Sequence, residues 1–145
     1  MKYIVTQVKT KVVKRASKKT LHGLVRENVV TGSNVYTDEF TAYQGLNSEY
    51  IHQVIEHATQ YVNGTVHTNG IENFWSLFKR ALRGTYVNCD VEHLSRYLDE
   101  QVFRFNNRRG NDGTRFTEVL SMVAGKRLTY AELIQKQIYK QKRLF

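Results

Sequence analysis

Apolar residues recur at helical spacing in three stretches of the chain, and each stretch predicts a helix with one buried side. These stretches cover residues 17–30, 69–83 and 91–106. In the middle one, Asn69 is suited to be the N-cap, and Gly84 to end the helix. We expect its aromatic residues and Phe105 to face the core. The apolar positions are Leu21, Leu24, Val25 and Val29, then Ile71, Phe74, Trp75, Phe78 and Leu82, and finally Val91, Leu94, Leu98, Val102 and Phe105.

Shorter patterns predict strands and minor helices between these elements. Residues 2–13 alternate enough for one strand or the remnant of a strand pair, and residues 33–37 and 50–55 are short β-favouring runs. Short helices are expected around Ala42 and over residues 116–123. Thr129 and Glu132 form a capping box that opens a last helix. With 145 residues, 41% hydrophobic content and no proline, the chain is expected to form one α/β domain over residues 1–145, with a helical C-terminal half.

The charge balance narrows the class of partner. Twenty-two lysines and arginines oppose thirteen acids, which gives a net charge of +9 and attracts polyanions such as DNA or RNA. The bases cluster in residues 9–19, 79–83, 104–109 and 136–143. No run approaches the roughly twenty apolar residues of a membrane span, so no membrane partner is expected. The single cysteine, Cys89, excludes an internal disulfide and a cysteine zinc site, and fits a reduced cytoplasmic setting.

The predicted helix over residues 69–83 carries an acid and a base on one face. Glu72 and Lys79 are seven residues apart, so they occupy nearly the same angular position two turns apart. A carboxylate that ligates a divalent cation and an ammonium that meets a phosphate could therefore share one strand of DNA. The alternative is structural, because Asn69 and Glu72 also form a capping-box pattern that only stabilises the start of a helix.

A second candidate acid lies upstream. Asp38 follows the predicted strand over residues 33–37, and the carboxyl ends of strands are where α/β folds place ligand-binding groups. The alternative makes Asp38 the N-cap of a short helix that runs through Tyr43.

Together these residues resemble a known family. Asp38 and Glu72 have thirty-three residues between them, and Lys79 follows. The surrounding stretches HTNGIENFWSLFKRALRGTY and HLSRYLDEQVFRFNNR resemble DDE-type transposases, in particular the ISXO-like group of bacterial insertion-sequence transposases, over about residues 10–110. The resemblance implies an RNase H-like fold in which three acids hold two divalent cations, Mg²⁺ or Mn²⁺. It also implies metal-dependent cleavage and transfer of DNA strands, with Asp38 as the second acid, Glu72 as the third and Lys79 facing the DNA backbone.

The first acid of that arrangement has no match here. Residues 1–37 contain no aspartate, and Glu27 falls inside a predicted helix. We therefore expect a sheet that lacks its first strand or strands, weak or lost metal binding, and a truncated, inactive copy of a transposase. Whether the chain is an enzyme stays open at this point. The alternative is a non-catalytic DNA-binding remnant that competes with a full-length transposase for the ends of the insertion sequence.

The remaining candidates surround these acids. The amide of Asn69 could join or replace Glu72 at a metal. The resemblance places His67 just before the helical acid, so it could orient a phosphate, a water or a metal ligand, unless it is a loop histidine bonded to nearby backbone. Arg104, Arg108 and Arg109 could bind phosphates, or they could form a solvated helix end at which cations offset the helix dipole. The expected partners are insertion-sequence ends and target DNA, with a homo-oligomer or full-length transposase, in the bacterial cytoplasm at the nucleoid. The expected DNA-binding residues are Lys79, Arg80, Arg83, His67, Arg104 and Arg108.

Overall fold

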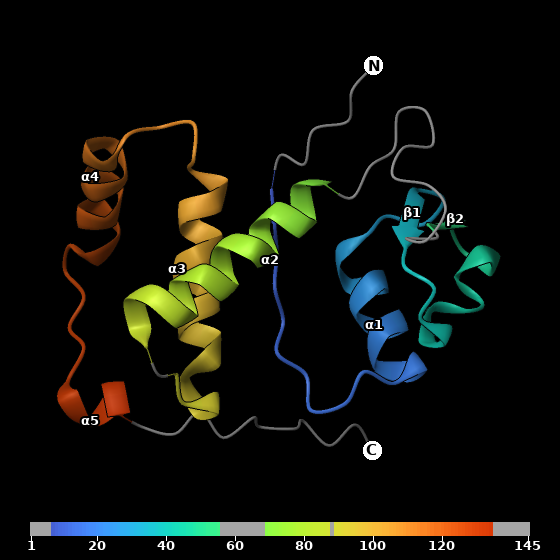
Figure 1. The fold of residues 1–145 in the computed structure, drawn as a ribbon, viewed down its shortest axis with the longest axis horizontal. Helices are drawn as coiled ribbons and strands as arrows, with labels where there is room; N and C mark the ends of the chain where they lie inside the picture. The colour runs from blue at the N-terminus through green and yellow to red at the C-terminus, as the bar shows by residue number, and fades with distance from the viewer. Residues whose placement is uncertain (1–6, 56–68, 88, 135–145) are drawn as a thin grey trace. The chain divides into compact units, whose positions relative to one another are not determined.

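The computed structural model describes residues 7–55, 69–87 and 89–134, which belong to two compact units (Figure 1). The first, here called the sheet unit, comprises described residues 13–55. The second, the helical unit, comprises described residues 7–12, 69–87 and 89–134. Each unit is described by itself.

The sheet unit is built from one helix and two parallel strands. Helix α1 (Lys18–Asn28) begins after Ser17, whose hydroxyl accepts a hydrogen bond from the Thr20 amide at 3.3 Å. Strand β1 (Asn34–Thr37) pairs in parallel with β2 (Ile51–Val54), with Asn34 opposite Ile51. The connection contains two 3₁₀ turns, η1 (Thr41–Tyr43) and η2 (Leu46–Ser48). Helix α1, both strands and η1 lie where the sequence predicts them, within one or two residues, whereas η2 was not predicted.

The buried side chains of the sheet unit come from the helix and the connection. Leu46 is fully buried, and Tyr50 and His22 are nearly so. Gly45, just before η2, has a φ of 96°, which a glycine adopts without the clash that a Cβ would cause. The turn therefore delivers Leu46 into the interior.

The described part of the helical unit contains three α-helices of 12 or 13 residues and one of five. Helix α2 (Asn69–Ala81) continues into a π-helical turn, η3 (Leu82–Tyr86), and a 3₁₀ turn, η4 (Val91–His93), leads into α3 (Leu94–Asn106). Helix α4 (Asp112–Val123) and α5 (Tyr130–Ile134) follow. The predicted capping box of α5 is confirmed, because the Glu132 carboxylate accepts a hydrogen bond from the Thr129 amide at 2.7 Å.

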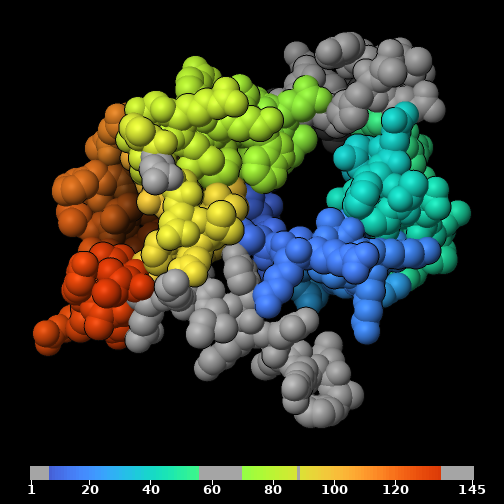
Figure 2. Space-filling view, turned by 60° about the horizontal axis from the view of Figure 1, so that its bottom comes forward, coloured from blue at the N-terminus to red at the C-terminus, as the bar shows by residue number. Residues whose placement is uncertain are grey.

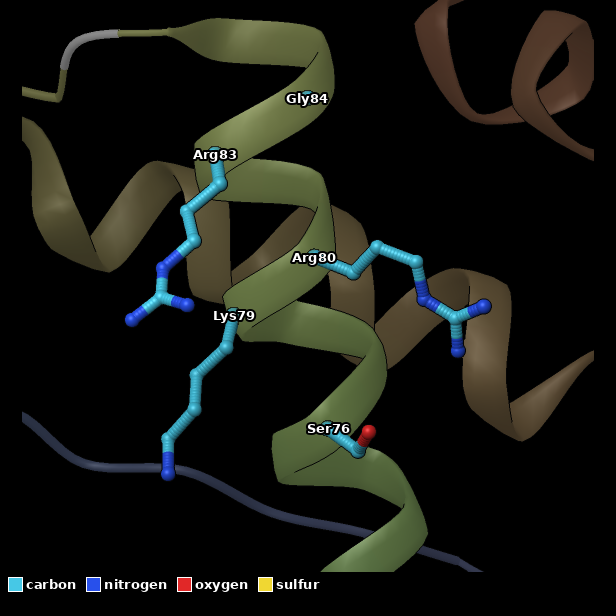
Figure 3. A pocket seen from close by; sticks show the side chains of 5 residues that line it. All are labelled: Ser76, Lys79, Arg80, Arg83 and Gly84. Atoms are coloured by element: carbon cyan, nitrogen blue, oxygen red, sulfur yellow. The ribbon is translucent and has the colours of Figure 1, made fainter.

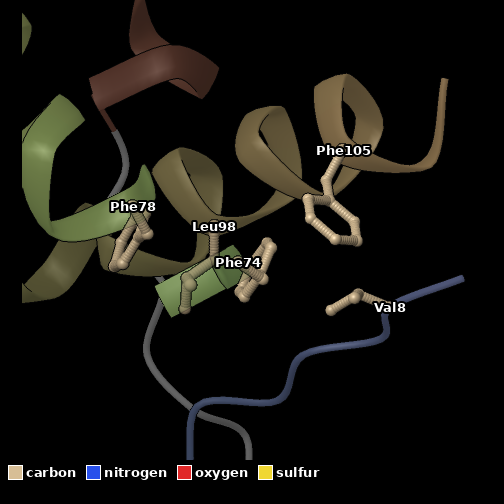
Figure 4. Packing of buried hydrophobic residues seen from close by; sticks show 5 residues of the cluster. All are labelled: Val8, Phe74, Phe78, Leu98 and Phe105. Atoms are coloured by element: carbon tan, nitrogen blue, oxygen red, sulfur yellow. The ribbon is translucent and has the colours of Figure 1, made fainter. Parts of the chain in front are cut away.

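Aromatic packing joins α2 to α3 (Figure 4). The Phe74 ring meets the Phe105 ring edge to face at 5.5 Å between centroids and is stacked parallel to Phe78 at 6.5 Å. Leu98 and Val8 complete the buried cluster. The periodic stripes of the sequence therefore predict most of this core.

An extended segment, residues 7–12, is fastened to the same cluster. The Val8 amide donates to the Asn106 side-chain oxygen at 2.7 Å, and the Asn106 side-chain amide donates to the Val8 carbonyl at 3.0 Å. An asparagine side chain thus satisfies the peptide groups that a neighbouring strand would otherwise bond. The prediction of a strand over residues 2–13 is wrong for its described part, residues 7–13, which form no strand.

Three further expectations need correction. Gly84 does not end the second helical stretch, since the chain continues through it in η3. Val91 is exposed, because it starts a 3₁₀ turn whose phase differs from that of α3. Trp75 is 41% exposed and so is not a core residue. It follows Phe74 by one position, a rotation of about 100° that carries it to the border of the buried stripe.

The helices and the parallel strand pair agree with an α/β class. The RNase H-like topology stays a prediction, as does the assignment of residues 1–145 to one domain. Among the described residues, no helix combines the length and apolar character that crossing a membrane requires.

Candidate nucleic-acid interface

The outward face of α2 carries a cluster of bases around an open hollow of about 450 Å³. Lys79 and Arg83 lie one turn apart and extend to the same side, whereas Arg80 extends to the other (Figure 3). This face is opposite the buried Phe74 and Phe78, so the same helical period that builds the core gathers the charges outside. The residues that line the hollow are Ser76, Lys79, Arg80, Arg83 and Gly84.

The electrostatics of this hollow favour an anion. Lys79, Arg80 and Arg83 are all exposed, and the lining contains no acidic side chain. Three positive charges on little more than one helical turn produce a local positive potential that attracts phosphate groups. Helix α2 forms part of the exposed surface of the helical unit, in yellow-green in Figure 2. An extended polyanion therefore has access to this face.

Glu72 lies in the first turn of α2 and is exposed. The helix confirms that Glu72 and Lys79 share one face, two turns apart. A carboxylate near a helix N-terminus is stabilised by the helix dipole, which accounts for part of its placement. Asn69 begins α2, but its side chain lies outside the described part of the structure, so neither its capping role nor its metal-binding role is tested.

Asp38 directly follows β1, as the sequence predicts, and is exposed. Its carboxylate accepts a hydrogen bond from the Phe40 amide at 3.2 Å. The residue before η1 is Phe40, so the alternative reading of Asp38 as the N-cap of this short helix is wrong. Burial and the negative charge of Asp38 both raise the pKa of Tyr43, with burial the larger cause.

The strand end that carries Asp38 also holds a histidine that the sequence analysis did not select. The Thr37 hydroxyl lies 2.9 Å from His52 Nε2 and donates a hydrogen bond to the Asp38 carbonyl at 2.9 Å. The parallel register brings these residues together, because Val35 is opposite His52 and Thr37 is two positions further along. No local sequence pattern indicates that His52 lies beside Thr37, because their proximity depends on the pairing of β1 with β2.

Asp38 belongs to the sheet unit, whereas Glu72 and Lys79 belong to the helical unit. The convergence of the two carboxylates therefore stays a prediction. Within the described part of each unit, no three His, Cys, Asp or Glu side chains form a cluster that could hold a metal ion. His67 lies outside the described residues.

Arg104 and Arg108 line a second hollow, of about 290 Å³, together with Arg115 from α4. Arg104 forms an ion pair with Glu100 at 2.9 Å. The Arg108 guanidinium lies 4.3 Å from the centre of the Phe105 ring and donates to the Phe105 carbonyl at 2.8 Å. This contact with a carbonyl at the end of α3 agrees with the structural alternative, in which these bases stabilise the helix end.

Arg115 was not selected from the sequence. It donates to the carbonyls of Asn107 and Gly110, at 3.2 and 3.0 Å, and forms an ion pair with Asp112 at 2.5 Å. Its main role is to fix the loop between α3 and α4. Compared with this second hollow, the face of α2 is the better candidate for an interface, because Arg104, Arg108 and Arg115 are engaged in contacts within the protein.

Comparison with known proteins bears on the same residues. Over residues 4–106 the sequence matches the family described as the ISXO2-like transposase domain. It is 40% identical over 102 residues to a transposase-like protein of Haemophilus influenzae, a match that covers 70% of this chain and 82% of that protein. No solved structure matches the chain. The matched region contains β1 with Asp38, the whole of α2 and the aromatic cluster, and the chain therefore belongs to the ISXO2-like transposase family.

Proposed function

We propose that this chain acts on DNA as an insertion-sequence transposase domain and binds the phosphate backbone through the outward face of α2. The observation that carries this proposal is the hollow lined by Lys79, Arg80 and Arg83 on a helix inside the family match. The net charge of +9 supports it, because phosphate neutralisation supplies affinity that does not depend on DNA sequence.

For the chemical step, we propose metal-dependent cleavage and transfer of phosphodiester bonds, with Asp38 and Glu72 as acidic groups. Carboxylate oxygens are the donors that Mg²⁺ and Mn²⁺ prefer. When bound, such cations activate the attacking hydroxyl group and stabilise the leaving oxygen at phosphorus. The donor type therefore fits, but two carboxylates from different units are fewer than a metal pair requires. Lys79 would hold the adjacent phosphate in register.

A second candidate function follows from the small number of acidic groups available to hold a metal pair. The absence of aspartate from residues 1–37 favours a non-catalytic DNA-binding protein that competes with a full-length transposase for insertion-sequence ends. The bases of α2 suffice for this role, and no cation is needed.

The binding proposal is tested with duplex DNA over a range of salt concentrations. We expect micromolar-range affinity that falls steeply with salt, and a slope of log affinity against log salt that is smaller by about two in Lys79→Ala/Arg83→Ala. The matched control is Lys126→Ala/Arg127→Ala, which removes one lysine and one arginine from exposed positions outside α2. Equal losses in both variants, or affinity independent of salt, would contradict the proposal.

The two chemical roles are separated by a cleavage assay on end-containing duplex DNA with Mg²⁺ or Mn²⁺. Nicking that is lost in Asp38→Asn and in Glu72→Gln, with DNA binding retained, supports the catalytic role. Binding without nicking, combined with inhibition of a full-length transposase on the same ends, supports the competitor.

A further inference from the structure

Trp75 is the chain's single tryptophan, and it is 41% exposed. Its indole is held in place by two phenyl rings, with centroids 5.1 Å away in Phe74 and 6.2 Å away in Phe78. An aromatic side chain that is fixed on one side and exposed on the other leaves apolar ring surface in contact with water. Such a surface is unfavourable unless a partner covers it.

The position of Trp75 on α2 places it beside the basic face. Lys79 follows Trp75 by four residues, so the two side chains are neighbours on the helix surface. Arg83 follows Lys79 by a further turn and lines the same hollow. A nucleic-acid strand whose phosphates contact Lys79 and Arg83 would therefore bring its bases within reach of the indole.

We propose that Trp75 stacks on an unpaired base of DNA whose phosphates bind Lys79 and Arg83. This inference rests on the proposed function and specifies its ligand as DNA with at least one base out of the duplex. Bases inside a duplex already stack on one another, so an indole can cover a base face only where the base is unpaired or displaced. Aromatic rings next to a basic groove are a general means of binding single strands without regard to sequence.

The single tryptophan makes the test direct, because its fluorescence reports Trp75 alone. The probes are a twelve-nucleotide oligothymidylate and an abasic strand of the same length, which carries the same phosphates without bases. We expect oligothymidylate to quench the emission and to bind about fivefold to 100-fold more tightly than the abasic strand. The abasic strand should bind through phosphates and cause little quenching.

Two variants distinguish stacking from a structural role. Trp75→Phe keeps an aromatic face, and Trp75→Leu keeps only apolar bulk. With a labelled oligothymidylate, Trp75→Leu should abolish the preference over the abasic strand and Trp75→Phe should retain most of it. The slope of affinity against salt should stay unchanged in both, since the phosphate contacts remain. If Trp75→Leu fails to fold, the comparison of the two strands on the unaltered protein decides the question.

Several results would overturn the inference. Equal affinity and equal quenching with the two strands would remove the stacking role and leave DNA binding intact. Emission typical of a buried indole, inaccessible to acrylamide in the free protein, would have the same effect. Absence of binding to either strand and to duplex DNA would overturn the proposed function together with this inference.

Discussion

The helical unit buries Phe74, Phe78, Phe105, Leu98 and Val8 in one cluster, whereas the described part of the sheet unit buries Leu46, Tyr50 and His22 around a pair of four-residue strands. In the helical unit, aromatic contacts fix α2 along one side, so its other side can carry three bases without weakening the core. In the sheet unit, the parallel register and the turns around Leu46 set the position of the strand end with Asp38. The comparison teaches that a basic face and an acidic strand end depend on different kinds of packing.

The largest loss of stability is expected from Phe74→Ala. Phe74 is fully buried and contacts rings on both α2 and α3, so its removal should leave a cavity and cost about 3–5 kcal/mol. The measurement is urea unfolding, combined with hydrogen exchange to locate the effect. Amide protection should fall in α2 and α3 more than in α1. An equal fall in both units would show that the aromatic cluster is not specific to the helical unit.

Leu46→Ala is expected to have the next largest effect, and in the other unit. Leu46 is fully buried, and truncation of its side chain should leave a cavity that costs about 2–5 kcal/mol of stability. Hydrogen exchange should then increase in α1 and around β1 and β2. Protection of α2 should change less, and a loss centred on α2 would contradict the assignment of Leu46 to a separate core.

Asn106→Ala tests how the extended segment is held. The substitution removes both bonds to the Val8 peptide and leaves its groups without these partners, which should cost about 1–3 kcal/mol. The matched control is Asn107→Ala, which removes a side-chain bond to the Phe103 carbonyl within the same helix end. We expect the control to cost less and only Asn106→Ala to expose residues 7–12 to limited proteolysis.

The sequence predicted those parts of the molecule that depend on local signals. Thr129 caps a helix because its hydroxyl can reach the amide of Glu132, three residues away, and the apolar stripes of α2 and α3 follow from the helical period. Periodicity could not decide whether Trp75 is buried or exposed, because Trp75 lies at the border of the apolar stripe of α2. The bond between Val8 and Asn106 spans 98 positions, and no local pattern indicates it.

The candidate site divides in the same way. The shared face of Glu72 and Lys79 follows from one helix, and the place of Asp38 follows from one strand, so both were predictable. The proximity of His52 to Thr37 depends on strand pairing, and Arg115 joins the second hollow through a loop. Contacts that depend on how separate elements pack are therefore the ones that the sequence left out.

The smallest effect is expected at the ion pair between Arg26 of α1 and Glu49, which lies just before β2 in the sheet unit. The Arg26 guanidinium donates two hydrogen bonds to the carboxylate, at 2.9 and 2.6 Å, and these bonds lower the pKa of Glu49 below its usual 4.5. Since the folded pKa is depressed, the stabilisation is present above about pH 4.5 and is lost as the pH falls through the folded value. Arg26 is exposed and Glu49 is partly exposed, so solvent screens the pair and Arg26→Ala should lower the Tm at pH 7 by at most about 5 °C.

The pH dependence of the Tm shows whether the ion pair between Arg26 and Glu49 causes the lower Tm of Arg26→Ala. The difference in Tm between the unaltered protein and Arg26→Ala should be constant from pH 7 to about pH 5 and should shrink as the pH falls through the lowered pKa of Glu49. Lys19→Ala is the matched control, because it removes a positive charge from an exposed position of the same helix. A Tm difference for Arg26→Ala that does not shrink with falling pH would mean that the arginine stabilises α1 by packing of its stem rather than through Glu49. The sheet unit would then depend on side-chain burial as the helical unit does, and the contrast between the two would be one of degree.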